Sequence, residues 1–584
     1  MNQHPMNGAA SPFDPDPLAR LRPPRLDGYA THEVMNQATA LVGHNAFTGD
    51  RLLGEIVARE GIGWARPLLA DAGATVASAR VADLARDANR FTPELRSHDR
   101  FGHRIDEIAF HPAWHELMSL AIGQGTHSLS WTAGRPGGHV ARGMLSYLWN
   151  QGESGICCPL GMTYSAVPAL RLQPDLAALW EPFILSTRYD AAAAPMQRKT
   201  GGTVGMTLTE KQAGSDLRAT QTTARPASAQ TGPGAAYLID GHKWFFSVPH
   251  SDLFVTLART DRGLSCFLLP GWLPDGSRNR LVIQRLKDKC GNRSNASSEI
   301  EYRGALAWLV GEEGQGIKAA LAMTHLTRLD FAIGSAGLMR RALSEAIHHT
   351  TARRAFQRRL VDQPLMQNVV ADLAVEVEAA TLLAFRLARA VDEEQSGDEA
   401  ASLLVRIGTP VAKYWNCKRV VGVVHEALEC HGGNGFVEEG PMARLYREAP
   451  LNGIWEGSGN IIALDVLRAA SRSPGTVPAF LDEVRRAGGG ERRLDRMVAR
   501  LEDELRRPEE HEARARRIVE KMATALQASL LLRHAPSAVA DAFCATRLEG
   551  DGGAVYGSLP AGVDRRAIVD RARIDGGGVG DARL

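Results

Sequence analysis

The hydrophobic pattern of this 584-residue chain changes twice, which limits the folds that the chain can adopt. From residue 29 to about 196 apolar residues recur at helical spacing, for example at Val34 and Ala38. Short apolar runs separated by turn residues follow, from about residue 204 to 310, and helical periodicity returns after Gly316. This order predicts an α+β fold in which a β domain lies between two helical domains.

The middle region predicts an antiparallel sheet built from hairpins. Asp240-Gly241 and Asp261-Arg262-Gly263 stand between apolar runs, and such residues are typical of hairpin turns. The predicted strands cover residues 204–208, 237–239, 244–246, 254–258 and 266–269.

Four segments are expected along the chain. Residues 1–203 consist of a Pro- and Asp-rich arm over residues 1–28 and a helical domain. Residues 204–318 form the β domain, and residues 319–472 form a helical bundle. Residues 473–584 predict a further helical segment because two apolar stripes recur there. The stripes are Leu494, Met497, Leu501 and Leu505, and Ile518, Met522, Leu526 and Leu530.

Charge and cysteine content exclude several classes of protein. A formal net charge of +2 points to no polyanionic partner. Seven cysteines without a Cys-x-x-Cys pair argue against a zinc ribbon or a disulfide framework, and they favour a reducing cytoplasm. No apolar run reaches about 18 residues, so we predict no membrane span. The lack of a Gly-Lys-Ser/Thr triplet excludes a P-loop nucleotide site. No metal site is predicted.

One carboxylate, Glu456, stands in a glycine- and serine-rich turn just before an apolar run that begins at Ile461. Glycine lets a backbone approach a ligand closely, and a helix N-terminus offers unpaired N–H groups to an anion. Such a turn suits a base that removes a proton from a substrate while backbone N–H groups hold an oxygen. The alternative is that Glu456 only complements the helix dipole.

Five segments resemble the motifs of the acyl-CoA dehydrogenase family, in the family's order and spacing. Each segment alone is a weak signal, whereas all five together are specific, and the resemblance covers roughly residues 100–470. The segments are Met206 to Asp216 (MTLTEKQAGSD), Gly241 to Ser247 (GHKWFFS), Ala352 to Phe356 (ARRAF), Gly432 to Phe436 (GGNGF) and Ile454 to Asn460 (IWEGSGN).

Further segments narrow the resemblance to the AidB-like branch of that family, among them Arg104-Ile105-Asp106 and the run from Leu286 to Ala296. The resemblance implies an FAD-containing cytoplasmic homotetramer that associates with double-stranded DNA in the alkylation-stress response. It also implies at most weak acyl-CoA dehydrogenase activity. The alternative is a metabolic dehydrogenase of short or branched acyl-CoA whose C-terminal tail is structural.

The resemblance also assigns roles to residues. Glu456 matches the base that removes the α-proton of an acyl-CoA, and Thr327 and Arg328 match a pair near that substrate. Arg353 and Gln363 match residues that reach the FAD of a neighbouring subunit. The other FAD contacts that it implies are Met206, Leu208, Thr209, Gly214, Ser215, Phe245, Phe246, Ser247, Ile454, Trp455, Gly457, Ser458 and Asn460.

Two of these assignments have plain structural alternatives. Phe245 and Phe246 alternate along a predicted strand, so one of the two side chains is expected in the core. Arg353 belongs to a basic cluster that also suits a solvated helix end.

The arginines of the fourth segment support two hypotheses. Arginine suits phosphate recognition because its guanidinium donates two parallel hydrogen bonds. Acidic residues such as Glu502 and Glu504 lie among these arginines, and i,i+4 pairing explains that mixture as salt-bridged helices. The predicted DNA contacts are Arg492, Arg493, Arg496, Arg514, Arg516 and Arg517.

Overall fold

The computed structural model describes residues 31–507 and 509–575, and the arm predicted over residues 1–28 lies outside them. Residues 31–37 belong to a first unit and contain no helix or strand, and the chain from Ala38 onward forms a second unit. The helix predicted from Val34 and Ala38 is wrong, because only bends and turns precede the first helix at Arg51.

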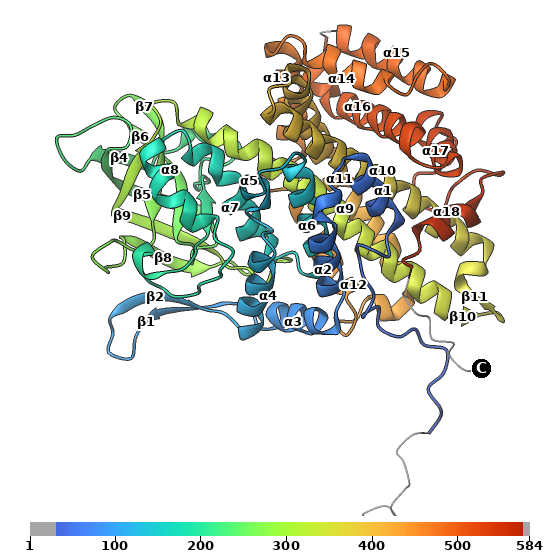
Figure 1. Cartoon of the computed structure of the whole chain (residues 1–584), viewed down its shortest axis with the longest axis horizontal. Helices are drawn as coiled ribbons and strands as arrows, with labels where there is room; N and C mark the ends of the chain where they lie inside the picture. The colour runs from blue at the N-terminus through green and yellow to red at the C-terminus, as the bar shows by residue number, and fades with distance from the viewer. Residues whose placement is uncertain (1–30, 508, 576–584) are drawn as a thin grey trace, which may run out of the picture. The chain divides into compact units, whose positions relative to one another are not determined.

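Helices make up most of residues 51–184, as predicted (Figure 1). Asp50 and Ser78 cap α1 and α3 by accepting a hydrogen bond from a backbone N–H of the first turn. A hairpin of β1 (Glu94–His98) and β2 (Arg104–Ala109) interrupts the helices, which the sequence pattern did not predict. The helices are α1 (Arg51–Arg59), α2 (Arg66–Val76), α3 (Ala79–Arg90), α4 (Pro112–Gly123), α5 (Leu129–Thr132), α6 (Gly138–Gly152), α7 (Cys157–Leu170) and α8 (Pro174–Ile184).

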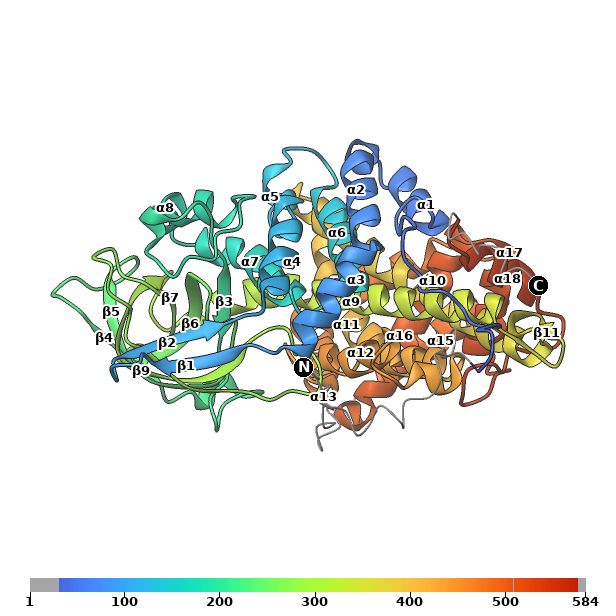
Figure 2. The ribbon, with the colours of Figure 1, turned by 90° about the horizontal axis from the view of Figure 1, so that it is seen from below.

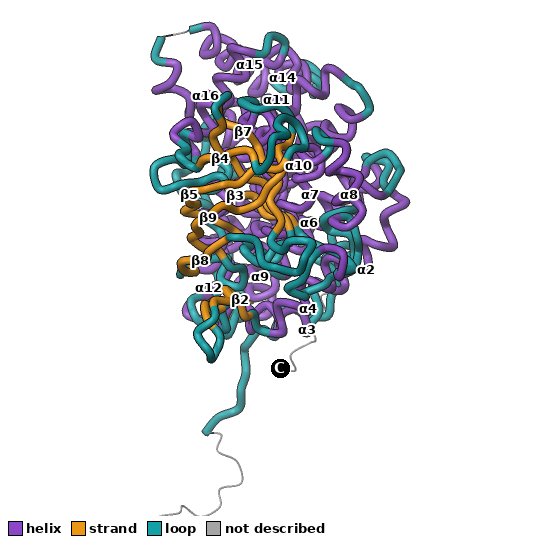
Figure 3. The backbone as a smooth tube through the Cα atoms, turned by 90° about the vertical axis from the view of Figure 1, so that its left-hand side faces the viewer, coloured by secondary structure: helices purple, strands orange, loops and turns teal. Residues whose placement is uncertain are grey.

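A seven-stranded sheet follows, seen edge-on in Figure 3. The pairings β6–β7, β7–β9, β9–β5, β5–β4 and β4–β6 close a ring. Most pairs are antiparallel, as predicted, but β3 runs parallel to β6. The turn predicted at residues 261–263 joins β6 to β7, whereas Asp240-Gly241 lies inside β5 at a register shift. The strands are β3 (Val204–Thr207), β4 (Thr223–Pro226), β5 (Ala236–Ser247), β6 (Leu253–Thr260), β7 (Gly263–Pro270), β8 (Leu281–Leu286) and β9 (Ser297–Val310).

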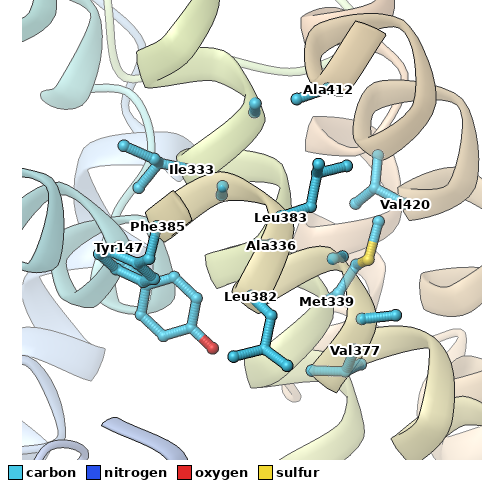
Figure 4. Close-up of a cluster of buried hydrophobic side chains, with 14 of the residues drawn as sticks. Tyr147, Ile333, Ala336, Met339, Val377, Leu382, Leu383, Phe385, Ala412 and Val420 are labelled. Carbon is cyan, nitrogen blue, oxygen red and sulfur yellow. The ribbon is translucent and has the colours of Figure 1, made fainter. Parts of the chain in front are cut away.

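Three long helices, α9 (Gly316–Ala352), α10 (Pro364–Gln395) and α11 (Glu399–Glu429), lie at the centre of the second helical region. Figure 4 shows side chains from these helices packed together with Tyr147 of α6. Gly337 lets α9 approach α6 closely, since a Cβ there would lie 2.5 Å from the Tyr147 carbonyl oxygen. The shorter elements are β10 (Arg354–Ala355), β11 (Arg358–Arg359), α12 (Met442–Glu448) and α13 (Gly459–Arg472).

The fourth segment packs onto these helices and shares their core (Figures 1 and 2). Both predicted stripes lie in helices: α15 is amphipathic, whereas α16 is buried on all sides from Met522 to Leu531 and packs against α10, α11 and α13. Across the described part of the chain, none of the helices combines the length and the hydropathy that a membrane crossing requires. The helices of this segment are α14 (Thr476–Arg485), α15 (Arg492–Arg506), α16 (His511–His534), α17 (Ser537–Phe543) and α18 (Arg565–Ala572).

One of the three hydrophobic clusters lies where predicted site residues gather. It includes Met206 of β3 and Met323 of α9, and the partly buried Leu208 and Trp455 pack against it. Residues of two motifs that are remote in sequence therefore meet between the sheet and the helices.

Candidate active site

Glu456 lies in a turn with an unusual backbone. Its φ is 54°, and φ of the following Gly457 is 103°, so two successive residues adopt the left-handed region. For a residue other than glycine this conformation costs roughly 1–3 kcal/mol, and it persists only where surrounding contacts hold it. Ser458 then precedes α13 as its N-cap residue. The turn therefore needs external support.

Two buried cations supply that support. Arg328 of α9 donates from Nε to the Glu456 carbonyl oxygen (3.2 Å), and Lys413 of α11 donates from Nζ to the Gly457 carbonyl oxygen (2.5 Å). Arg328 also donates to the Asp465 carboxylate (2.8 Å). Within the protein, Arg328 therefore connects the glutamate turn to α13, and its predicted place near the substrate stays a prediction.

The Glu456 carboxyl has a raised pKa. Burial raises its pKa above the ordinary value, while Arg328, Lys413 and the adjacent hydroxyls of Thr324 and Thr327 act in the opposite direction. A general base works best when its pKa approaches the working pH, so a raised pKa suits a glutamate that must accept a proton. Thr327, predicted near the substrate, lies beside this carboxyl.

Sequence reasoning missed Lys413. Its side chain is among the largest that are fully buried, and burial lowers its pKa to about 8. One signal was available, a single cation within an otherwise apolar run of α11. Because burying a charge is expensive, such a lysine must reach a buried acceptor, here the Gly457 carbonyl.

The two segments predicted to line the flavin are adjacent in space. Thr209, which follows β3, accepts a hydrogen bond from the backbone N–H of Trp244 on β5 (2.8 Å). The buried ion pair of Glu210 with Lys243 (2.9 Å) joins the same two segments. Other predicted flavin contacts are open to solvent, namely Gly214, Ser215, Ile454, Ser458 and Asn460, and Ser247 is half-buried.

The phenylalanine pair resolves into one exposed and one buried side chain. Phe245 is 51% exposed, whereas Phe246 is 1% exposed and packs on Phe254, with ring centroids 4.6 Å apart. The side chain of Phe246 therefore belongs to the core inside the sheet, as the structural alternative predicted. Of the two rings, only that of Phe245 is open to solvent.

Arg353 and Gln363 lie at the far end of α9 from the glutamate turn. Arg353 ends α9, and the helix rise of ~1.5 Å per residue puts it roughly 40 Å along the axis from Thr327. Gln363 donates to the Ala355 carbonyl oxygen (3.0 Å) of the neighbouring hairpin. The fold therefore does not bring these two residues to the turn of their own chain (Figures 1 and 2).

Comparisons with known proteins match most of the chain. The adaptive response protein AidB N-terminal domain matches residues 36–191, the acyl-CoA dehydrogenase middle domain residues 205–305, and the acyl-CoA dehydrogenase C-terminal domain residues 314–471. The putative acyl-CoA dehydrogenase AidB of Escherichia coli (strain K12) is 43% identical over 527 residues, which cover 90% of this chain and 96% of that protein. The chain belongs to the AidB branch of the acyl-CoA dehydrogenase family. The predicted family and fold are thereby confirmed.

Solved structures resemble this AidB-branch chain over most of its length. Caenorhabditis elegans ACDH-11 in complex with C11-CoA has a TM-score of 0.81 at 26% identity and covers 89% of this chain and 94% of its own. The apo-form of Bd2924 has a TM-score of 0.79 at 28% identity and covers 87% of this chain and 100% of its own. A Bacillus anthracis acyl-CoA dehydrogenase complexed with FAD has a TM-score of 0.58 at 18% identity, covers 75% of this chain and 78% of its own, and shows the fold alone.

Several predicted DNA contacts of this AidB-branch protein are engaged within the protein. Arg493 pairs with Glu491 and Asp541, and Arg496 pairs with Glu549. Arg517 pairs with Glu504 (3.0 Å). These pairs match the salt-bridged alternative.

Arg514 has a structural role between α15 and α16. It donates to the Glu504 carboxylate (2.7 Å) and to the carbonyl oxygens of Arg507 (2.6 Å) and Glu509 (2.9 Å). A guanidinium with this set of acceptors is no longer free to bind phosphate, so we remove Arg514 from the predicted DNA contacts. Arg492 is exposed, with no ion pair among the described residues, and Arg516 lies beside the Tyr414 hydroxyl.

Proposed function

We propose that this protein is an FAD-containing flavoprotein of the acyl-CoA dehydrogenase type, in which Glu456 removes the α-proton of a bound acyl thioester. The observation that carries the proposal is the half-buried Glu456 side chain beside Thr324 and Thr327, in a strained turn held by Arg328 and Lys413. The α-proton of a thioester is weakly acidic, so its removal needs a fixed base from which water is excluded.

The open residues of the predicted cofactor segments suit FAD. Phe245 and Ile454 are 51% and 63% exposed, so both apolar side chains are open to a ligand. Thr209 and Ser215 offer hydroxyls to the flavin ring and the pyrophosphate, and Asn460 lies in the first turn of α13. When bound, FAD supplies the acceptor for the hydride that leaves the β-carbon.

An anaerobic titration tests this proposal. The purified protein is expected to be yellow, with about one FAD per chain, and short or branched acyl-CoAs are expected to bleach the flavin absorbance. We expect slow reduction, in keeping with at most weak dehydrogenase activity. A protein that cannot be reconstituted with FAD, or a flavin that none of these acyl-CoAs reduces, would refute the proposal.

We further propose a cytoplasmic homotetramer in which Arg353 and Gln363 contact the FAD of a neighbouring subunit, with domain boundaries near residues 203, 318 and 472. The distance of Arg353 from its own glutamate turn and the 92% exposure of Phe356 on the adjacent hairpin support this assembly. All seven cysteines are free thiols, which suits a reducing compartment. Arg353→Ala is expected to weaken FAD retention, and a monomer replete with FAD would overturn the assembly.

Association with duplex DNA in the alkylation-stress response is a second candidate. It rests on membership of the AidB branch and on exposed arginines of the fourth segment. These are Arg492, together with Arg506 and Arg507, which form surface pairs with Glu502 and Asp503. Counterion release predicts an affinity that falls steeply with salt and varies little with sequence. Fluorescence anisotropy with several duplexes checks this, and no binding near physiological salt would favour the metabolic dehydrogenase with a structural tail.

A further inference from the structure

A pocket of about 360 Å³ lies where the C-terminal segment meets the hairpin end of the helical bundle. Its walls come from the start of α1, from β11 and the 3-10 turn Leu360–Asp362, from the first turn of α10, and from α18 and the residues after it. Figures 1 and 2 show α18, β11 and α10 at the same end of the molecule. A pocket of this size has room for a small-molecule ligand.

The lining of this pocket is mainly charged. Four of its ten lining residues are arginines and three are aspartates. Two of the arginines are fully paired: Arg51 donates two hydrogen bonds to Asp575 (3.2 and 3.3 Å), and Arg359 donates two to Asp362 (2.7 and 3.2 Å). Each of these carboxylates therefore neutralises one guanidinium.

The other two arginines share a single carboxylate. Asp570 lies 3.8 Å from Arg566 and 3.3 Å from Arg573, and neither guanidinium donates a hydrogen bond within residues 31–507 and 509–575. The Nε–H of Arg573 is shielded from solvent and has no acceptor. Four arginines against three aspartates leave one positive charge in surplus, together with N–H donors that have no acceptor.

The charges from different walls of the pocket act on one another. Hydrogen bonds from Arg359 lower the pKa of Asp362 against the opposing effect of burial, and the charges of Arg566 and Arg573 lower it further. The arginines near α18 are therefore close enough to the 3-10 turn to contact the same ligand. The first turn of α10, which contains Gln367, adds the positive end of a helix dipole.

We propose that this pocket binds a phosphate monoester of a small hydroxylated molecule, of the class of sugar phosphates and nucleoside monophosphates. Such a phosphate carries about −1.5 to −2 charges at neutral pH and offers three acceptor oxygens, which suits two guanidiniums that lack acceptors. Asp362, Asp575 and Gln367 offer hydrogen-bonding groups to the hydroxyls of the ligand. This site lies outside the proposed flavin and acyl thioester sites.

Calorimetry on the full-length protein, saturated with FAD and at low salt, tests the inference. AMP and ribose 5-phosphate are expected to bind, whereas adenosine and ribose should bind at least about tenfold more weakly, because they lack the charged group. Inorganic phosphate should also bind more weakly, since it lacks the hydroxylated body. The affinity for both esters should fall as salt rises, because the arginines are partly exposed.

Two variants with opposite expected effects locate the site. Arg573→Gln removes a charged donor and is expected to weaken binding of both esters about tenfold. Asp570→Asn removes the carboxylate that competes with the phosphate, so it is expected to tighten binding several-fold. Arg303→Gln is the matched control, because Arg303 is an exposed arginine of the sheet domain that pairs with Glu301 (2.9 Å), and it should keep the affinity.

Thermal unfolding first shows whether each variant folds like the wild type. If Arg573→Gln does not, Arg566→Gln repeats the test at a side chain that is 83% exposed. The inference is overturned if neither ester binds, if adenosine, ribose or inorganic phosphate binds equally well, or if the arginine variants bind like Arg303→Gln. It is also overturned if Asp570→Asn loses affinity, because a purely structural ion-pair network would be weakened by either change.

Discussion

The glutamate turn and the C-terminal segment both contain cationic side chains that contact oxygen acceptors. The two regions differ in how far these side chains are buried. At the glutamate turn, Arg328 and Lys413 are buried and donate to backbone carbonyls, which fixes the position of the Glu456 carboxyl. In the C-terminal segment, Arg507 pairs with Asp503 at the surface, and both side chains are more than half exposed. Charge interactions strengthen where water is excluded and weaken at the surface. Cationic side chains therefore fix the position of the proposed base in one region, and in the other they mainly contribute charge to the surface.

The largest expected effect concerns the base. Glu456→Gln keeps the shape of the side chain but cannot accept a proton, so flavin reduction by acyl-CoA is expected to slow by about 10²–10⁴-fold while FAD stays bound. Stopped-flow absorbance measures the rate. Glu429→Gln changes a surface glutamate and is the control, with no expected loss. An unchanged rate for Glu456→Gln would show that the base lies elsewhere.

Lys413→Met should cause the next largest loss of flavin reduction rate, because it removes a hydrogen bond that holds the strained turn. Misplacing a catalytic group by about 1 Å can slow a reaction by about 10²-fold. The Lys413 charge lowers the pKa of Glu456, so its loss raises that pKa and moves the acidic limb of kcat/KM to higher pH. Lys413→Arg keeps the charge and should keep the limb. If the acidic limb of kcat/KM does not move in Lys413→Met, Lys413 contributes only packing.

A buried ion pair between the C-terminal segment and α10 sharpens the comparison. Glu483 of α14 accepts from Arg386 of α10 (2.9 Å) and from Arg533 of α16 (2.8 Å). Burial opposes the charge, but the arginines lower the pKa of Glu483 from 4.5 to about 2. Its stabilisation is therefore present above pH 4.5 and is lost as the pH falls toward 2. Glu483→Gln is expected to cost roughly 3 kcal/mol at neutral pH.

Urea denaturation across that pH range checks this prediction. The difference between the wild type and Glu483→Gln should shrink below pH 4.5, whereas Asp503→Asn, in an exposed pair with Arg507, should behave like the wild type throughout. If the two variants lose equal stability, burial does not separate the two kinds of ion pair.

The smallest expected effect is at the exposed arginines. Replacing Arg492, Arg506 and Arg507 with glutamate is expected to leave the FAD spectrum and the flavin reduction rate unchanged. If the protein binds duplex DNA through them, the slope of log affinity against log salt should fall by about one per lost phosphate contact, alike for all sequences. An unchanged slope in anisotropy titrations would show that these arginines are not the contacts.

The sequence predicted those elements whose hydrophobic pattern repeats over many neighbouring residues. The stripes of α15 and α16 were found because each repeats over several turns, and the motif order identified the family. The β1–β2 hairpin was missed because its strands are short and no more than half apolar. The turn predicted at Asp240-Gly241 was wrong, because pairing of β5 with β9 continues through a register shift and overrides the local preference.

The sequence by itself determined the family, the order of the helical and β regions, and the presence of one glutamate in a glycine- and serine-rich turn, because each of these follows from neighbouring residues. Only the tertiary structure decided that Lys413 and Arg328 hold that turn, that Phe246 is buried while Phe245 is open, and that Arg514 closes a loop. These outcomes depend on contacts between residues far apart in the chain, or on which face of a strand becomes buried. Burial, which raises the pKa of Glu456, is a property of the packed core and of no single segment.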